Sequence, residues 1–172
     1  MKKLFALLMA LCLLGTCALA EPTEINWSDL EAQVAESGID GDFYSVSDIG
    51  VKMFIPTALQ NVELTEDDVN QGYICFLANE DQSALVAVMY ANFEGKSLAD
   101  YAAVLPEVGA TEIEMIVVNG IPAVSYEVPG NDTLNVAMGT DKGYIIEFVF
   151  KPASDEGFKS IAAIMSASIQ AE

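Results

Sequence analysis

The sequence predicts an α+β fold, with a central antiparallel sheet and helices packed on its faces as in a sandwich. Two observations favour this class. Short runs of apolar and β-branched residues are separated by turn-forming segments such as Asn119-Gly120 and Pro129-Gly130-Asn131-Asp132. Other segments carry apolar residues at helical spacing, so each of them needs a surface to cover.

The predicted elements follow one another as helix, four strands, helix, four strands and helix. The first helix begins at the capping box Ser28-Asp29-Leu30-Glu31 and ends at Gly38. The second runs from Ser97 to Pro106, and the third covers roughly 154–169. A single helical turn is expected after Thr65. The expected strands are 43–46, 51–55, 73–78, 84–91, 112–118, 123–128, 133–138 and 144–150.

The first twenty residues predict a secretory signal peptide. Lys2 and Lys3 precede an apolar run over 4–14, and Ala18-Leu19-Ala20 supplies the small residues of a cleavage site after Ala20. The apolar run is shorter than the roughly 20 residues that span a bilayer. We therefore expect a secreted protein with a flexible tail over 21–25 and a single α+β domain over 26–172.

A second interpretation of the same segment concerns location. Leu14-Gly15-Thr16-Cys17 resembles the lipidation box of bacterial lipoproteins, although Thr16 stands where that box usually has Gly, Ala or Ser. Lipidation at Cys17 would anchor the protein at the cell envelope, and only then would it contact a membrane. Free secretion is favoured, because Ala18 and Ala20 satisfy the ordinary cleavage rule.

Composition excludes many activities. The chain has no histidine and no arginine, and its formal charge is −19, which becomes −21 when Lys2 and Lys3 leave with the signal. Ser-His-Asp and Cys-His catalysis, imidazole metal sites and arginine clamps are therefore excluded. The negative charge disfavours nucleic acid and anionic lipid and favours cations or basic partners. We expect no catalytic residues and no cofactor.

The remaining cysteine of the secreted chain, Cys75, cannot form an intramolecular disulfide, because Cys12 and Cys17 belong to the signal. It lies in the apolar run Tyr73-Ile74-Cys75-Phe76-Leu77, which is typical of a buried strand. We therefore expect it to pack as a small apolar side chain.

Carboxylates are the abundant functional groups, so calcium binding is one alternative function. Its weak candidate ligands lie in two loops: Asp40, Asp42 and Asp48 in the first, and Glu66, Asp67 and Asp68 in the second. The first loop lacks the EF-hand pattern, and the second is better explained as acid at a helix start. A less favoured alternative is a carboxylate-dependent hydrolase that uses Glu112 and Glu114, which alternate onto one face of a strand.

Aromatic residues are candidates for a recognition surface for protein or sugar. They are Trp27, Tyr44, Tyr73, Tyr90, Tyr101, Tyr126 and Tyr144. Because most of them alternate with aliphatic residues in strands, packing in the core is their favoured role.

Several segments together resemble the PsbP-like domain. They are Gly50-Val51-Lys52-Met53-Phe54-Ile55-Pro56, Lys96-Ser97-Leu98-Ala99-Asp100-Tyr101, Asn119-Gly120-Ile121-Pro122-Ala123, Gly143-Tyr144-Ile145-Ile146-Glu147-Phe148 and the closing helix over 158–169. The resemblance covers about 43–170, and its motifs are short and structural. The form of the signal and the motifs also resemble exported proteins of bacteria, gut clostridia among them.

The resemblance implies a non-catalytic role. Members of the family include accessory subunits of the photosynthetic oxygen-evolving complex, a yeast nuclear-import factor that binds Ran, and exported bacterial proteins. None of their partner-binding residues matches a position in this sequence. We therefore expect an exported binding or accessory module, at the cell envelope or outside the cell, whose partner is a protein or an envelope component.

Overall fold

The computed structural model describes residues 22–46, 49–91, 93, 95–140 and 143–172. The predicted cleavage site at Ala20, the lipidation candidate Cys17 and the calcium candidate Asp48 lie outside these residues. Within the described part of the chain, no helix is long and apolar enough to cross a membrane.

An eight-stranded sheet forms the centre, in the order β1-β7-β8-β9-β10-β6-β5-β4. Its strands are β1 (Thr23–Ile25), β4 (Gln60–Val62), β5 (Tyr73–Ala78), β6 (Leu85–Ala91), β7 (Thr111–Val118), β8 (Ile121–Val128), β9 (Thr133–Gly139) and β10 (Ile145–Lys151). Neighbouring strands are antiparallel, except that β1 runs parallel to β7. The predicted antiparallel core of the sheet is confirmed, and β1 makes the whole sheet mixed.

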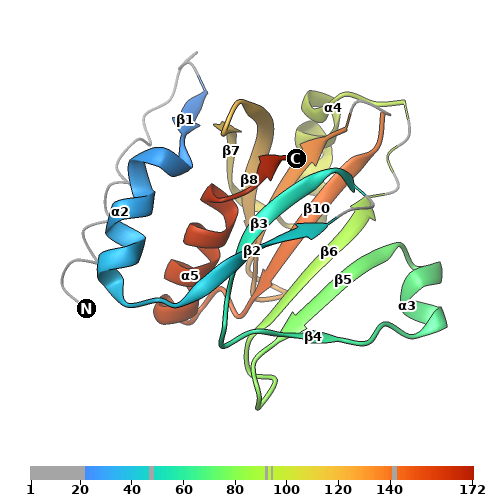
Figure 1. Cartoon of the computed structure of the whole chain (residues 1–172). Helices are drawn as coiled ribbons and strands as arrows, with labels where there is room; N and C mark the ends of the chain where they lie inside the picture. Colours follow the sequence, from blue (N-terminus) through green and yellow to red (C-terminus); the bar gives the residue numbers. More distant parts are fainter. Residues whose placement is uncertain (1–21, 47–48, 92, 94, 141–142) are drawn as a thin grey trace.

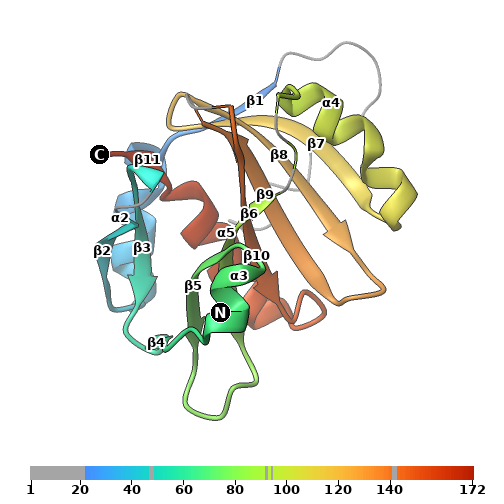
Figure 2. The same ribbon diagram turned by 90° about the vertical axis from the view of Figure 1, so that its right-hand side faces the viewer.

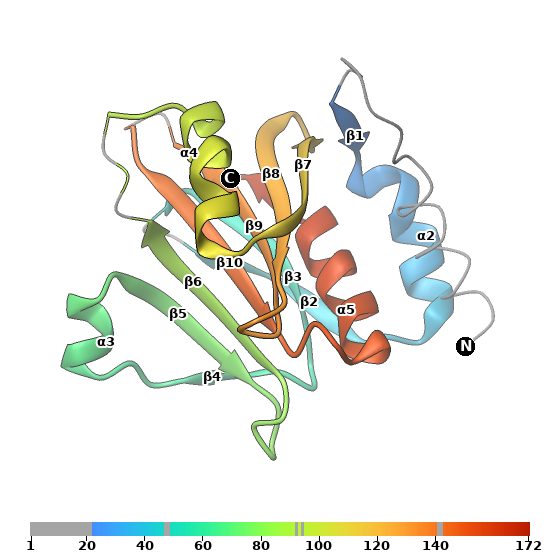
Figure 3. The same cartoon turned by 180° about the vertical axis from the view of Figure 1, so that it is seen from behind.

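A second sheet and the helices cover the two faces of the first. The second sheet has the order β11-β3-β2 and consists of β2 (Gly41–Val46), β3 (Val51–Pro56) and β11 (Gln170–Ala171). The helices are α2 (Trp27–Ser37), α3 (Glu66–Asn70), α4 (Leu98–Val104) with the 3-10 turn η2 (Leu105–Val108), and α5 (Glu156–Ala167). Figure 1 shows α5 and the second sheet in front of the large sheet, and Figure 3 shows α4 on its other face. The layers are seen edge-on in Figure 2.

Each layer boundary has its own apolar core. The largest lies between the large sheet, α5 and β3, and includes Phe148, Phe150, Met53 and Met165, all essentially inaccessible to solvent. A second core joins α4 to the opposite face of the sheet. A third contains Trp27 and Phe54 and joins α2 to the second sheet and α5. This arrangement confirms the predicted α+β class, since α2, α4 and α5 each bury an apolar side against a sheet.

The start of the domain differs from the prediction. The expected loose tail over 21–25 is wrong for Thr23–Ile25, which forms β1 and pairs with Ile116 to Val118. The first helix begins at Trp27 rather than after a capping box at Ser28, and its N-cap Asn26 makes no side-chain cap. The reason lies far away in sequence, because the Trp27 amide donates to Oδ1 of Asn119 at 2.7 Å. In contrast, the capping boxes at Thr65 and Ser97 are present.

Asn119, in the turn between β7 and β8, joins both ends of the domain. Its backbone has φ of 48°, a left-handed conformation that asparagine tolerates better than most residues. Its Nδ2 donates to the carbonyl oxygens of Ala167 at 2.9 Å and Ile169 at 2.7 Å, where α5 ends. Its own amide donates to the carbonyl of Ile25 in β1 at 2.8 Å. One side chain therefore satisfies polar backbone groups at two helix ends that would otherwise lack partners.

Gly41, the first residue of β2, allows the second sheet to close against Phe54. A Cβ atom at this position would lie 2.5 Å from Cζ of Phe54 and 2.6 Å from the Ile55 carbonyl oxygen. We expect Gly41→Ala to lower the free energy of unfolding by about 1–3 kcal/mol, because the backbone of β3 has to shift. Urea unfolding will measure the change. Gly139→Ala is the control, since nothing lies within 4 Å of a Cβ there, and equal stability of both variants would contradict the prediction.

Candidate functional site

Exposed aromatic side chains gather on β2. Phe43 is 39% exposed and Tyr44 is 53% exposed, and both are flanked by the exposed residues Asp42 and Ser45. We call these four residues the β2 surface. The strand lies at the free edge of the second sheet, because among the described residues only β3 pairs with it. An exposed pair of aromatic residues on an edge strand has the composition of a protein-recognition surface.

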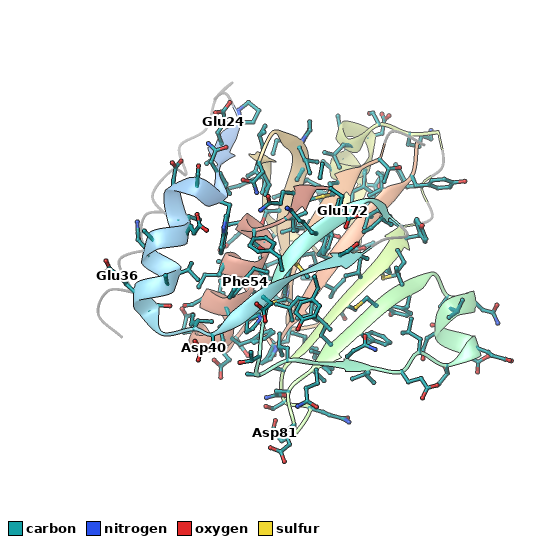
Figure 4. All side chains as sticks on the ribbon, viewed as in Figure 1. Glu24, Glu36, Asp40, Phe54, Asp81 and Glu172 are labelled. Atoms are coloured by element: carbon teal, nitrogen blue, oxygen red, sulfur yellow. The ribbon has the colours of Figure 1, made fainter. Side chains whose placement is uncertain are left out.

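One side chain of the β2 surface, Phe43, packs against two aromatic rings of the core. The ring of Phe43 meets Trp27 edge-on at a centroid distance of 5.5 Å and Phe54 at 6.0 Å, and Trp27 stacks on Phe54 at 5.7 Å. Nζ of Lys52 lies 5.8 Å from the centre of the Phe43 ring. Figure 4 places Phe54 between α2 and the second sheet. Since Trp27 and Phe54 are buried, the Phe43 ring is held in place before any ligand arrives.

A separate polar cluster lies beneath α4. The hydroxyl of Tyr126 donates to Oε1 of Glu147 at 2.6 Å, and the hydroxyl of Tyr101 lies 3.2 Å from Oε2 of the same carboxylate. The two hydroxyls are 3.0 Å apart. Tyr101 comes from α4, whereas Tyr126 and Glu147 come from β8 and β10. The cluster therefore fastens the helix to the sheet through hydrogen bonds to a charged group.

The environment keeps both tyrosines protonated. Burial, reinforced by the charge of Glu147, raises the pKa of Tyr101 to about 12 and raises the pKa of Tyr126 further. A phenol with a raised pKa is a poor general base at neutral pH, and its proton is already donated to the carboxylate. The cluster is built to hold α4 rather than to transfer a proton to a substrate.

The calcium candidates that the structure describes do not converge. Asp40 lies in the loop before β2 and Asp42 on β2, whereas Glu66, Asp67 and Asp68 lie on the short helix α3. Asp68 forms the capping box with Thr65, whose hydroxyl and amide bonds lower the pKa of the Asp68 carboxyl. Among the residues described, no three acidic or cysteine side chains are grouped as a metal site requires. The calcium alternative, which includes Asp48, stays a prediction.

The carboxylate pair proposed for hydrolysis does not have the expected regular geometry. Glu112 has φ of 52°, and the register with β8 shifts between Thr111 and Glu114, so a bulge interrupts the alternation that placed both carboxylates on one face. Glu112 and Glu114 are both exposed. Nothing in this arrangement desolvates one carboxyl relative to the other, as an acid and base pair requires.

Cys75 is half-buried on β5, and burial raises the pKa of its thiol. A raised pKa disfavours the reactive thiolate. Its sulfur lies 4.0 Å from Oδ1 of Asn61, a neighbour on β4. Cys75 therefore has the environment of a packing residue.

The other aromatic residues divide into buried and exposed groups. Trp27, Tyr101 and Tyr126 are buried and Tyr73 is half-buried, as the core interpretation predicted. Tyr90 and Tyr144 are 37% and 41% exposed and form a T-shaped pair at 5.8 Å at the ends of β6 and β10. Phe43 was not among the aromatic residues predicted as candidates for a recognition surface. The adjacent aromatic residues Phe43-Tyr44 held a signal, because neighbours on a strand point to opposite faces and one of them stays exposed when only one face is covered.

Comparison with known proteins adds evidence on the fold. No family model and no curated protein matches the chain. Among solved structures, the chain is similar to cyanobacterial PsbP (CyanoP) from Synechocystis sp. PCC 6803, determined in solution, with a TM-score of 0.54 and 13% sequence identity. The match covers 92% of this chain and 99% of the other. The fold is PsbP-like. At this identity the PsbP-like fold is what the two proteins share, and function has to be argued from the residues of this chain.

Proposed function

We propose that this protein is an exported, non-catalytic binding or accessory module that recognises a protein or envelope component through the β2 surface. The observation that carries the proposal is the exposure of Phe43 and Tyr44 on an edge strand, with Phe43 packed against the buried rings of Trp27 and Phe54. Aromatic side chains that are fixed before binding lose little conformational entropy when a partner covers them. The accessory role implied by resemblance to the PsbP-like domain agrees with this reading.

The chemistry of the chain supports binding over catalysis. Without histidine or arginine, acid–base chemistry would depend on carboxylates, tyrosines, lysines or the thiol of Cys75. The carboxylate of Glu147 is occupied by two tyrosine hydroxyls, and Lys159 forms an ion pair with Glu127. These groups are used in holding helices α4 and α5 to the sheet.

Affinity purification from the culture medium and envelope of the source cells tests this function. The immobilised protein is expected to retain a specific partner, and Tyr44→Ser is expected to reduce its recovery at least fivefold. Tyr144→Ser is the control, because it removes another exposed tyrosine, one that precedes β10 in the large sheet and does not lie on β2. Recovery of no specific partner, or equal loss in both variants, would count against the proposed function.

A further inference from the structure

The free edge of β2 differs from the other sheet edges in length. Strands β1 and β4 at the ends of the large sheet have three residues each, and β11 has two, whereas β2 has six. All six residues of β2 pair with β3 in continuous register, without a bulge. The strand contains no proline and no lysine, the residues that commonly protect an edge against further pairing. Its only charged side chain is Asp42.

Hydrogen bonds around β3 show which backbone groups of β2 face outward. The amide of Phe54 donates to Oγ of Ser168 at 2.8 Å, so it does not bond across to its partner Phe43. The amide of Thr57 donates to the Asp40 carbonyl at 2.9 Å. These two residues therefore form a hydrogen-bonded pair immediately before the first pair of β2 and β3, Gly41 and Pro56. In an antiparallel pair, bonded and non-bonded positions alternate. The amide and carbonyl groups of Phe43 and Ser45 therefore point to the free edge.

The two faces of the edge differ in chemistry. Phe43 and Ser45 lie on the face that also carries Phe54 and Lys52, where the aromatic surface favours an apolar side chain and the charge of Lys52 disfavours a basic one. Asp42 and Tyr44 lie on the opposite face. There a carboxylate and an exposed aromatic ring favour a lysine or arginine, through an ion pair and a cation–π contact.

We infer that the edge of β2 is a strand-addition site for an extended partner segment in which basic and apolar residues alternate. This inference rests on the binding role proposed above. The partner's backbone pairs with Phe43 and Ser45 in antiparallel direction. Its apolar side chains pack on Phe43, and its basic side chains face Asp42 and Tyr44. A second copy of this chain is the disfavoured occupant, because each copy carries a formal charge of −21 once Lys2 and Lys3 leave with the signal, and its β2 strand has Asp42 and no basic residue.

Synthetic peptides with acetylated and amidated ends test the inference. The peptide Val-Lys-Val-Lys-Val-Lys-Val is expected to bind the purified protein, and its Glu counterpart is expected to bind at least tenfold more weakly. Methylation of the valine amides removes the donors that face β2 and is expected to weaken binding about tenfold or more. Methylation of the lysine amides is the matched control, because in antiparallel pairing these amides point away from β2.

Substitution of Ser45 gives an independent test. Ser45→Pro removes an amide that faces the free edge and makes no bond to β3, a position where proline is tolerated in a strand. We expect peptide affinity to fall about tenfold with little change in melting temperature, while Ser45→Thr keeps the affinity. Titration calorimetry and thermal unfolding supply the two readouts.

The inference is overturned if the basic peptide fails to bind at millimolar concentration, if both methylated peptides bind like the parent, or if Ser45→Pro keeps full affinity while folded. It is also overturned if sedimentation shows a dimer that Ser45→Pro dissociates, since the edge is then occupied by a second copy. The proposed function is judged separately by partner recovery with Tyr44→Ser. If a specific partner is recovered and the Ser45→Pro variant still binds it, the proposed function is supported but the strand-addition inference is wrong.

Discussion

Replacing Asn119 with alanine is expected to lower the free energy of unfolding by about 3 kcal/mol, which corresponds to a fall in melting temperature of about 6–12 °C. The variant loses three side-chain hydrogen bonds, those to the carbonyls of Ala167 and Ile169 and the one from the amide of Trp27. It also places alanine in a left-handed conformation, which costs about 1 kcal/mol more than asparagine does.

Asn119→Asp separates these contributions. Aspartate keeps the acceptor for Trp27 and tolerates the left-handed backbone, but it loses both donated bonds and places a carboxylate against two carbonyl oxygens. We therefore expect Asn119→Asp to be destabilised nearly as much as the alanine variant at pH 7. Asn131→Ala, at an exposed turn, is the control and should stay within about 0.5 kcal/mol of the wild type. Denaturant unfolding measures all three, and a stable Asn119→Asp would show that the two donated bonds contribute little.

Alkaline pH is expected to destabilise the protein through the tyrosine cluster. Because the folded-state pKa of Tyr101 is raised to about 12 and that of Tyr126 is raised further, the folded state holds protons that the unfolded state releases near pH 10. The stability that the cluster contributes is fully present below pH 10 and is lost progressively as the pH rises toward and beyond 12. Unfolding curves at pH 8, 10 and 11 will follow this loss.

Tyr126→Phe identifies the group responsible. At pH 7 it is expected to lower the free energy of unfolding by about 1.5–3 kcal/mol, because a hydrogen bond to the charged Glu147 is removed. Above pH 10 the difference in free energy of unfolding between the variant and the wild type should become smaller, because the wild type loses the stability that the Tyr126 hydroxyl contributes. Tyr44→Phe is the control, since it removes the hydroxyl of an exposed tyrosine outside the cluster. A constant gap between pH 8 and 11 would rule out Tyr126 as a source of the alkaline loss.

Other groups titrate in the same direction and set the background for this comparison. Burial lowers the pKa of Lys159, but the hydrogen bond to Glu127 and the charges of Glu127, Glu112 and Glu156 raise it more. The pKa of Lys159 is therefore raised overall. The thiol of Cys75 also has a raised pKa, because of burial. Stability from both groups is present at neutral pH and lost as the pH rises through their folded-state values. Only the difference between the wild type and Tyr126→Phe therefore reports on the cluster.

Local patterns predicted the elements that depend on local contacts. The capping boxes at Thr65 and Ser97 need only four consecutive residues, and both are present. The pattern at Ser28 failed although it also has a hydroxyl residue at its first position and an acid at its fourth. A distant side chain, Oδ1 of Asn119, binds the Trp27 amide, and the helix starts earlier. Strand β1 was missed for a similar reason, since its three residues become a strand only by pairing with β7, about ninety residues away.

The candidate site was predictable only in part. Two adjacent aromatic residues in a strand indicate that one is exposed, but which sheet edge stays free depends on the topology of the whole chain. The cluster of Tyr101, Tyr126 and Glu147 joins one helix to two strands, and no spacing in the sequence brings these three residues together. The bulge at Glu112 likewise arises from pairing with β8, which removed the regular alternation that the sequence suggested.

The position of Asn119 between the two ends of the chain also has a consequence for the order of folding. Its partners lie at Ile25 and Trp27 on one side and at Ala167 and Ile169 on the other. The contacts that close the fold therefore have large sequence separations, and such contacts form late and slowly. Until residue 169 has left the ribosome, Asn119 lacks part of its partners, so the domain completes these contacts only after α5 has been made.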